Sequence, residues 1–461
     1  MRTDKDVIIV GAGLTGLALG VNLKHRGIDF FITEKDSEAG GVIRTGEEKG
    51  FVYEKGPNTG VLSTPELVEL FDLLGKLCEL EKADKSAAKR YIWKEGKWRA
   101  IPSGLLSAVG TPLFSLYDKF RILGEPFRKP GTDPYESVAD LVRRRLGKSF
   151  LVYAVNPFIS GVYAGDPEKL ITKFALPKLY NLEQNYGSFI RGAIKKAKED
   201  KTELERRATK EVFSVKGGLA NLIKAMVRFI GEENILLQCE DTEIDYRDGL
   251  YIVRTAGEAG KNEFVSRSLV TTTGSESLES LLAFTGSEEL SAVTSVKHAR
   301  IVQVAAGFNE WKGMPLDAFG GLVPSREKRK VLGVLFPSAI FTGRAPEGGA
   351  LLSVFMGGYR NPQITGKTDD EIKGIVMDEL TNMMGTGDNI PDMIKIFRYE
   401  KAIPQYERSS EERFRVIGDI QSRYPGLHIA GNIRDGIGMA DRVKQAGQLA
   451  AAIENYTKQK A

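Results

Sequence analysis

Glycine residues near the N-terminus have the type and spacing of a nucleotide-binding turn. A Gly-x-Gly-x-x-Gly segment lies between an apolar run, Val7 to Val10, and a helical pattern over residues 14–25. In such a segment one glycine permits a tight turn, the next lets the backbone approach a pyrophosphate, and the third lets helix and strand pack closely. The helix N-terminus adds unpaired N–H groups and a partial positive charge. The segment comprises Gly11, Ala12, Gly13, Leu14, Thr15 and Gly16.

Glu34 and a second glycine-rich segment follow. Glu34 ends a predicted strand over residues 30–33, where its carboxylate is placed to bind ribose hydroxyls. The arginine of the second segment suits a diphosphate, although in isolation it could equally form a surface salt bridge. A second glycine-rich run after a dinucleotide motif resembles the flavin-binding amine oxidase superfamily, which implies FAD. That run supplies Gly40, Gly41, Val42 and Arg44.

A third glycine-rich turn lies near the C-terminus, between an apolar run at residues 427–430 and a long helical pattern. Reducing a flavin places negative charge along its N1–C2=O edge. A helix that begins near this turn would stabilise that charge by about 0.3–2 kcal/mol. The alternative is an ordinary helix start without a ligand. The residues of interest are Asn432, Ile437, Gly438 and Met439.

The composition limits the classes of protein that need to be considered. The chain has 461 residues, of which 42% are hydrophobic and 27% charged, as in a soluble globular protein of two or three domains. The 65 basic and 61 acidic residues nearly balance, which argues against a nucleic-acid partner. Cys78 and Cys239 suit a reducing, cytoplasmic compartment, and we expect neither a disulfide framework nor a metal site. The uncharged stretch from Val7 to Leu23 is too short for a membrane anchor.

Strand and helix patterns along the chain predict an α/β fold, α+β overall. A βαβ unit at the start and a strand–helix pair at the end predict a Rossmann-like domain, and β-rich segments predict an antiparallel sheet in a second domain. The resemblance implies that the first is an FAD-binding domain of the amine oxidase type and that an interleaved substrate domain contains the sheet and helices. The predicted FAD-binding domain is discontinuous and covers residues 1–85, 206–290 and 406–461. A helical substrate domain is expected at residues 86–205, and a substrate-binding domain with the antiparallel sheet at residues 291–405.

Several local predictions are more specific. Residues 35–58 are expected to form a loop, and a hairpin is expected around Trp93 and Trp98. A helix should begin after Thr64, with Pro65 at its first position. The pattern over Asp369 to Met384 predicts an amphipathic helix.

With these elements placed, the chain resembles the oxygen-dependent protoporphyrinogen oxidase family, which includes the bacterial coproporphyrinogen III oxidases. The resemblance runs nearly from end to end, and its most distinctive segments are residues 54–59, 156–167, 213–219, 321–327 and 355–358. It implies noncovalent FAD, with adenine beside the backbone of Asp241. It places the isoalloxazine beside Gly56, Pro57, Asn58 and Thr59. Covalent attachment is not expected, because no cysteine lies near the C-terminal turn.

The resemblance also implies where a porphyrinogen would bind. It places Gly161 where backbone approaches the macrocycle, and three apolar residues around the rings: Leu322, Leu335 and Phe355. As a lone pattern these would be read as core residues. Eukaryotic members of the family have a propionate-binding arginine where this chain has Leu106. We therefore expect carboxylate recognition from Arg99 or Lys97.

No residue is predicted to be an acid–base catalyst, because His25, His298 and His428 are scattered and are expected to be structural. We hypothesise that flavin N5 accepts hydride in three rounds, that O2 reoxidises the flavin to give H2O2, and that the porphyrin passes to a ferrochelatase. The alternatives are another amine oxidase or a carotenoid desaturase, and a flavin-binding protein without turnover.

Membrane contact is left open by the sequence. Residues 104–123 contain many apolar side chains, which could cover a tunnel mouth at a membrane surface or pack in the interior. We favour interior packing because the segment lacks a clean basic opposite face.

Overall fold

The first sheet is mixed and combines strands from the start, the middle and the last part of the chain. In the computed structural model, which describes residues 2–102, 107, 110–257 and 260–460, strand β1 (Arg2–Val10) pairs in parallel with β2 (Phe30–Thr33) and β13 (Gly260–Thr271). Val7 to Val10 are buried, as expected for a central strand covered on both faces. The sheet is completed by β10 (Ile235–Leu236), β11 (Glu240–Arg247), β12 (Leu250–Gly257) and β19 (Leu427–Ile429).

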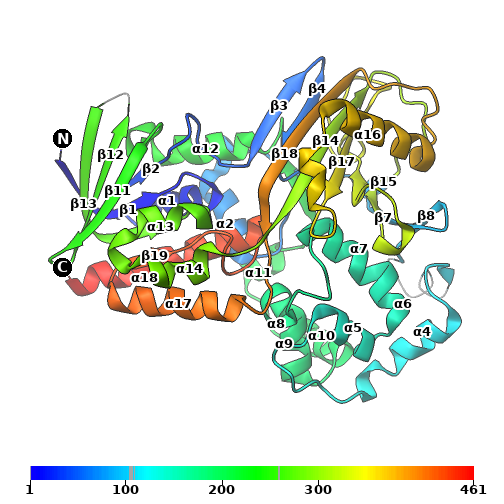
Figure 1. The fold of residues 1–461 in the computed structure, drawn as a ribbon, viewed down its shortest axis with the longest axis horizontal. Coiled ribbons are helices and arrows are strands. Elements are labelled where there is room, and N and C mark those ends of the chain that lie inside the picture. The colour runs from blue at the N-terminus through cyan, green and yellow to red at the C-terminus, as the bar shows by residue number, and fades with distance from the viewer. Residues whose placement is uncertain (1, 103–106, 108–109, 258–259, 461) are drawn as a thin grey trace.

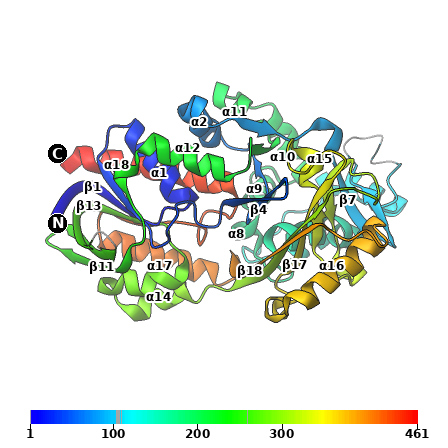
Figure 2. The same ribbon diagram turned by 90° about the horizontal axis from the view of Figure 1, so that it is seen from above.

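Helices cover both faces of this sheet (Figures 1 and 2). One face packs in a single core cluster against α1 (Leu14–His25), α2 (Pro65–Leu74), α12 (Ala220–Ile230) and α18 (Met439–Lys460). The other packs against α13 (Leu278–Leu281), α14 (Ser287–Thr294) and α17 (Ser410–Arg423). The predicted Rossmann-like arrangement is confirmed, and both termini lie at this end of the molecule (Figure 1).

A separate seven-stranded sheet, the second sheet, is antiparallel except where β15 pairs with β7. Helix α16 (Asp369–Met384) covers one face, as predicted, and packs in the core with it. The hairpin predicted around Trp93 and Trp98 is present, but it belongs to this sheet and not to the helical segment. In order, the strands are β18 (Met393–Pro404), β14 (His298–Phe308), β17 (Ala350–Gly357), β16 (Gly333–Leu335), β15 (Ala318–Leu322), β7 (Lys89–Lys94) and β8 (Lys97–Ala100), and α15 (Pro337–Ile340) follows β16.

The predicted loop at residues 35–58 is wrong, because it contains a hairpin of β3 (Arg44–Glu48) and β4 (Phe51–Lys55). Polar residues dominate β3, so its sequence lacks the apolar alternation of a half-buried strand. Tertiary contacts supply the missing stability, since Phe51 is fully buried in a cluster with strands of the second sheet. Three further strands form a small sheet: β5 (Gly60–Val61), β6 (Leu80–Lys82) and β9 (Val212–Val215).

Residues 111–207 are largely helical and form a separate lobe (Figure 1). Its interior contains an ion cluster in which Arg145 Nε lies 2.6 Å from Glu183 and 3.4 Å from Glu125, and all three side chains are buried. A long helical run combines α6 (Lys148–Phe150) and α7 (Asn156–Phe158) with π-type turns over Leu151–Val155 and Ile159–Tyr163. The other helices are α4 (Leu116–Leu123), α5 (Val138–Arg145), α8 (Thr172–Ala175), α9 (Pro177–Tyr186), α10 (Phe189–Ala197) and α11 (Glu203–Arg207).

Helix α4 overturns the expectation of interior packing for residues 104–123. Leu116, Tyr117 and Phe120 are 68%, 72% and 70% exposed. The helix begins with a capping box between Ser115 and Asp118, and none of its residues is buried. The expectation does hold just before the helix, where Leu113 and Phe114 are buried.

Two further observations bear on the ends of that segment and on membranes. Leu106 lies outside the described residues. No helix in the described ranges has both the length and the apolar character needed to cross a membrane.

Candidate active site

The first glycine turn has the geometry that the sequence predicts. Gly11 has a φ of +110°, and a Cβ there would come within 2.7 Å of Thr272 Oγ1. A Cβ on Gly16 would lie 2.0 Å from the carbonyl oxygen of Gly11, so helix and turn are in direct contact. Gly13 differs, because a Cβ there would meet no atom of the described residues within 4 Å. The backbone beside Gly13 therefore faces open space, where a phosphate can approach closely.

Polar groups surround the start of α1. Gly13 is its N-cap, and no acidic residue lies in the first turn, so the helix presents its N–H groups to that space without a competing side chain. Glu34 lies directly beside the turn. Its Oε2 accepts the N–H of Ala12 at 2.7 Å, and its Oε1 accepts the N–H of Asp36 at 3.0 Å. Each oxygen keeps a further lone pair for a ribose hydroxyl.

The second glycine segment lies on the first. The N–H of Gly40 donates to the carbonyl of Ala12 at 2.8 Å, and a Cβ on Gly41 would be 3.6 Å from Gly13 Cα. Val42 follows with 61% of its surface exposed. The structure thus brings the two segments together around one space.

Among the described residues, Arg44 forms a salt bridge and also keeps one N–H group without a partner. Its Nη2 lies 2.9 Å from Asp36 Oδ2, while its Nε is buried and has no hydrogen-bond partner within the described ranges. A buried guanidinium N–H without a partner is a feature that a bound anion would complete. Together with the space beside Gly13, it fits the diphosphate of a dinucleotide.

Asp241 lies on β11, is exposed and has a φ of +46°. The segment just before it runs alongside the end of β2. The N–H of Gln238 donates to the Asp36 carbonyl at 3.0 Å, and the N–H of Cys239 donates to the Glu34 carbonyl at 2.9 Å. The contact of Asp241 with adenine stays a prediction.

The segment Gly56 to Thr59 connects the first two glycine segments to the second sheet. Gly56 has a φ of +131°, and a Cβ there would lie 2.2 Å from the Val42 carbonyl oxygen. Its N–H donates to Gln303 Oε1 at 3.1 Å. Asn58 is buried, and its Oδ1 accepts the Ser353 hydroxyl at 2.6 Å. Pro57 and Thr59 are half-buried beside these two anchors.

A buried ion pair supports the same junction. Glu54 accepts the Thr45 hydroxyl at 2.6 Å and the Leu219 N–H at 2.9 Å, and it lies 3.3 Å from Arg344 Nη1. Burial raises the pKa of Glu54, and its hydrogen bonds and Arg344 oppose that rise. No motif in the sequence pointed to this cluster, because its members are spread over three hundred residues.

The C-terminal turn meets the N-terminal one. Met439 and Ala440 belong to the same core cluster as Ala12 and Leu14. The helix start predicted near Gly438 is confirmed, since α18 begins at Met439 and the N–H of Gly438 donates to Asp441 Oδ2 at 3.1 Å. The two ends of the polypeptide therefore pack together.

Three buried residues that sequence reasoning missed hold this turn. The Tyr406 hydroxyl donates to the Asn432 carbonyl at 2.9 Å and accepts the N–H of Gly436 at 3.1 Å, and Ile437 packs in the same apolar cluster as the Tyr406 ring. Gln445 accepts the N–H of Gly431 at 3.0 Å, and Arg442 donates to the Gly431 carbonyl. Burial raises the pKa of Tyr406 to about 12, so its hydroxyl remains a donor at neutral pH.

The three apolar residues predicted to contact the substrate lie on one face of the second sheet. Leu322 of β15 and Phe355 of β17 both pair with Gly333 of β16, and Leu335 follows Gly333 by two positions. Paired residues, and residues two apart on one strand, point to the same side of a sheet. All three are partly exposed, whereas Val354 on the opposite face is fully buried. We call Leu322, Leu335 and Phe355 the apolar wall.

The apolar wall shares its face with the anchors of the Gly56–Thr59 segment. Gln303 pairs with Phe355, and Ser353 pairs with Leu335. The strand pairing thus places the predicted flavin-ring segment and the predicted substrate residues at the same face. At the sheet edge, Arg99 pairs with Ile92, which pairs with Leu322, so Arg99 is on this face as well.

Gly161 is in contact with the apolar wall. A Cβ built on Gly161 would come within 2.4 Å of Leu322 Cδ2. The remaining predicted substrate residue is therefore brought to the same place. The histidines are not, and burial lowers the pKa of His298 and lowers that of His428 to about 4, so both are neutral at pH 7.

Comparison with known proteins identifies the family. The flavin containing amine oxidoreductase family matches residues 14–453. The chain is 28% identical to protoporphyrinogen oxidase 2, chloroplastic/mitochondrial, of Arabidopsis thaliana, over 98% of this chain and 94% of that protein. It is 24% identical to coproporphyrinogen III oxidase of Bacillus subtilis (strain 168), over 96% of each.

A solved structure supports the fold. A protein from Exiguobacterium sp. 255-15, provisionally named a protoporphyrinogen oxidase, superposes with a TM-score of 0.78 at 22% identity, over 98% of this chain and 99% of its own. The match of the sequence to the family and the superposition of the fold lead to the same assignment. The chain belongs to the flavin containing amine oxidoreductase family and is an FAD-dependent oxidoreductase.

Proposed function

We propose that this protein oxidises a porphyrinogen to the corresponding porphyrin in heme biosynthesis, with O2 as the electron acceptor. The relatives named above act on protoporphyrinogen or coproporphyrinogen according to their names, and they align over nearly the whole chain. Among the residues that carried the resemblance, Gly161 is in contact with Leu322. Leu322 and Phe355 both pair with Gly333, and both observations support the proposal.

The observation that carries the proposal is the shared face of the second sheet. The apolar wall, Gln303 and Ser353 are on that face, and the last two residues bond the backbone and side chain of the Gly56–Thr59 segment. A large, mainly apolar macrocycle next to a flavin needs such a surface. Orientation against it, with water excluded, is the contribution that the protein makes to hydride chemistry.

The chain's residues would divide the work of binding the cofactor. Gly11 to Gly16, Glu34, Gly40 to Val42 and Arg44 would bind its adenosine diphosphate half, and Gly56 to Thr59 with the C-terminal turn would enclose its ring. FAD, when bound, supplies the acceptor for electron pairs from the substrate and returns them to O2. Removal of six electrons and six protons from a porphyrinogen, in three rounds, would consume three O2 and give three H2O2.

The test is anaerobic mixing of the purified holoprotein with coproporphyrinogen III or protoporphyrinogen IX, monitored by flavin absorbance. We expect bleaching with at least one of them, followed on aeration by porphyrin fluorescence and three equivalents of H2O2. An unchanged flavin spectrum with both would refute the proposal. Bleaching by a primary amine instead would favour the amine oxidase alternative.

We also propose that α4 contacts a membrane surface peripherally, close to where the product would be handed to a chelatase. Leu116, Phe120 and Leu123 are each about 70% exposed on one side of the helix. The Leu116→Ser/Phe120→Ser variant should lose co-sedimentation with anionic vesicles. Ile390→Ser, which changes an equally exposed residue at a distant turn, should not. Equal sedimentation of all three proteins would contradict the proposal.

A further inference from the structure

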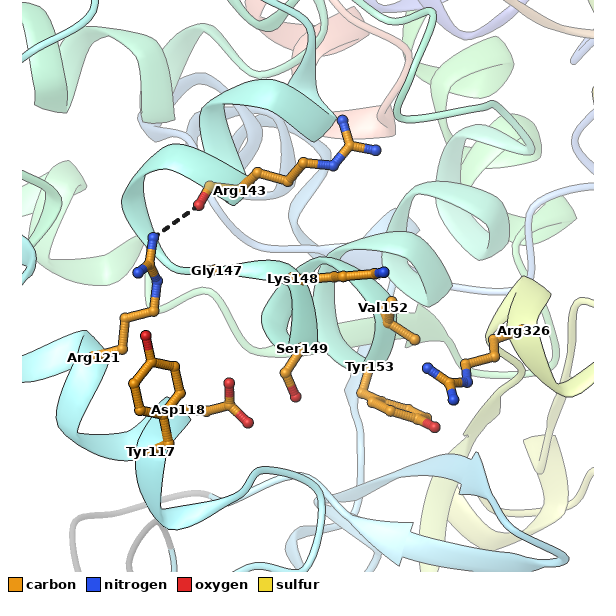
Figure 3. A pocket seen from close by; sticks show the side chains of 10 residues that line it. All are labelled: Tyr117, Asp118, Arg121, Arg143, Gly147, Lys148, Ser149, Val152, Tyr153 and Arg326. Atoms are coloured by element: carbon orange, nitrogen blue, oxygen red, sulfur yellow. Dashed lines mark hydrogen bonds between the residues drawn. The ribbon is translucent and has the colours of Figure 1, made fainter.

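A basic cleft lies between the helical lobe and the second sheet. It consists of two neighbouring cavities of about 550 Å³ and about 450 Å³, which share Arg143, Lys148, Val152 and Arg326 in their walls. Figure 3 shows the larger one, with side chains from α4, from the helical run after Gly147 and from the loop after β15 around it. The lining combines cations with tyrosines, which suits an organic anion better than a bare inorganic one.

Basic side chains outnumber acidic ones in the walls of the basic cleft, but ion pairs with Asp140 and Asp166, outside the walls, neutralise Arg143 and Arg360. Five basic side chains line the two cavities, whereas Asp118 and Glu168 are the acidic ones. Asp118 is occupied by the capping of α4, where it accepts the N–H of Ser115 at 3.0 Å. Glu168 is paired with Arg143. The basic residues are Arg121, Arg143, Lys148, Arg326 and Arg360.

Lys148 and Arg326 are the cations left for a ligand. Both are exposed at the cleft, and neither has an ion-pair or hydrogen-bond partner in the parts of the chain that the structure describes. Arg121 differs, since it donates to the backbone carbonyl of Arg143 (dashed in Figure 3). Two free cations from separate chain segments, with paired cations behind them, create a local positive potential.

The basic cleft and the apolar wall are carried by the same two chain segments. Arg326 follows Leu322 by four positions, and Lys148 begins the helical run that contains Gly161. The two segments touch twice: Asn156 Oδ1 accepts the N–H of Ser325 at 2.8 Å, and Gly161 contacts Leu322. These contacts are five helical residues apart, or about 8 Å, and Lys148 precedes Asn156 by eight residues, or about a further 12 Å along the run. Tyr153, in the cleft wall, is in the same apolar cluster as Leu322.

We infer that the basic cleft binds propionate carboxylates of the porphyrinogen, with Lys148 and Arg326 as the ligands. The inference rests on the proposed function. It assigns carboxylate recognition to the outer end of the slot that the apolar wall lines, and it gives a preference for substrates with more carboxylates. Coproporphyrinogen III carries four of them and protoporphyrinogen IX carries two.

The Lys148→Gln/Arg326→Gln variant tests this assignment. Exposed charge pairs each change affinity by a few-fold, so KM for coproporphyrinogen III should rise about ten-fold, with kcat and the flavin spectrum unchanged. The rise should be smaller for protoporphyrinogen IX. Added salt should raise KM of the wild type and have little effect on the variant. Arg228→Gln, an exposed arginine on α12, should behave as wild type.

The same variants separate the residue assignment from other outcomes. If Arg99→Gln reproduces the rise in KM and the double variant does not, the carboxylates bind at the sheet edge and the inference is wrong. If the double variant loses only vesicle sedimentation, the cleft takes lipid headgroups and the inference is also wrong.

A binding measurement without turnover separates the inference from the proposed function. Coproporphyrin III, the stable oxidised acid, should quench protein fluorescence of the holoprotein on binding, and its tetramethyl ester should bind at least ten-fold more weakly. The double variant should lose that difference. If no porphyrinogen is oxidised but the acid still binds through Lys148 and Arg326, the proposed function fails while the cleft assignment stands. Equal binding of acid and ester by the wild type overturns the assignment.

Discussion

The side chain of Leu322 lies directly against the backbone of Gly161, so closely that a Cβ on Gly161 would stand 2.4 Å from Leu322 Cδ2. This contact joins the helical lobe to the second sheet. It also restricts the side chain of one residue of the apolar wall.

Replacing Gly161 by alanine should therefore displace Leu322. Overpacking by one methyl group costs about 1–3 kcal/mol where neighbours cannot move. We expect kcat/KM for the porphyrinogen to fall about ten-fold or more, with FAD content unchanged. Gly418→Ala on α17, where a Cβ would meet no described atom within 4 Å, is the matched control. Normal kinetics in the Gly161 variant would show that Leu322 does not line the slot.

Gly13→Asp should abolish FAD binding without unfolding the apoprotein. Gly13 has an ordinary φ of −72°, and its missing side chain faces open space, so only a ligand forbids a larger residue there. Flavin absorbance after gel filtration measures the loss. Urea unfolding of the two apoproteins should agree within about 0.5 kcal/mol. A yellow Gly13→Asp protein would contradict the position of the pyrophosphate.

Phe355→Ala should leave the flavin spectrum intact while raising KM or lowering kcat, because Phe355 is partly exposed on the wall. Val354→Ala makes the matched comparison, since its side chain is fully buried on the opposite face of the same strand. That variant should lose about 1–3 kcal/mol of unfolding free energy and keep its KM. If Phe355→Ala loses FAD or misfolds, Phe355 is a core residue.

Tyr406→Phe should weaken FAD binding. The ring would keep its apolar contacts, but the Asn432 carbonyl and the Gly436 N–H would lose their partner, at about 1–3 kcal/mol. Tyr163→Phe removes a comparable hydroxyl, which donates to the Ala175 carbonyl at 2.7 Å in the same apolar cluster. Both variants should be destabilised, and only Tyr406→Phe should raise the Kd for FAD. Equal Kd values would remove the C-terminal turn from the cofactor site.

Acid should destabilise the protein through His428. Burial lowers its pKa from 6.5 to about 4, so between these values the unfolded chain takes up a proton that the native state excludes. The stability that His428 contributes is present above pH 6.5 and is lost as the pH falls toward 4, up to about 3 kcal/mol. Urea unfolding at pH 7 and pH 4.5 should show a smaller loss for His428→Gln than for the wild type. Parallel losses would contradict the shift.

Short-range patterns predicted the elements whose residues also decide their own conformation. Helix α1, strand β2 and helix α16 have the bounds that periodicity and glycine positions indicated, because the residues that determine each of these elements lie close together in the sequence. The hairpin β3–β4 could not be found in this way. Its stability comes from Phe51 and from the Glu54–Arg344 pair, which are contacts made across hundreds of residues.

The residues of the candidate site show the same difference between local patterns and long-range contacts. The spacing of residues in glycine motifs, such as Gly13 and Gly41, predicts a bound ligand. Gln303, Tyr406 and Gln445 do not, since an isolated polar residue carries no signal until the fold shows the backbone group that it satisfies. Lys148 and Arg326 look like ordinary surface cations in the sequence. Only the contact of their two segments places them at one cleft.

The packing of Met439 beside Ala12 and Leu14 has a consequence for how the protein is made. A chain that lacks α18 should not complete the predicted cofactor site, because Met439 and Ala440 would be missing from the core beside the first glycine turn. We therefore expect FAD to bind only after α18 has packed against the N-terminal turn, a contact between residues far apart in the sequence. A protease that removes α18 would release the flavin even if every glycine of the first turn were intact.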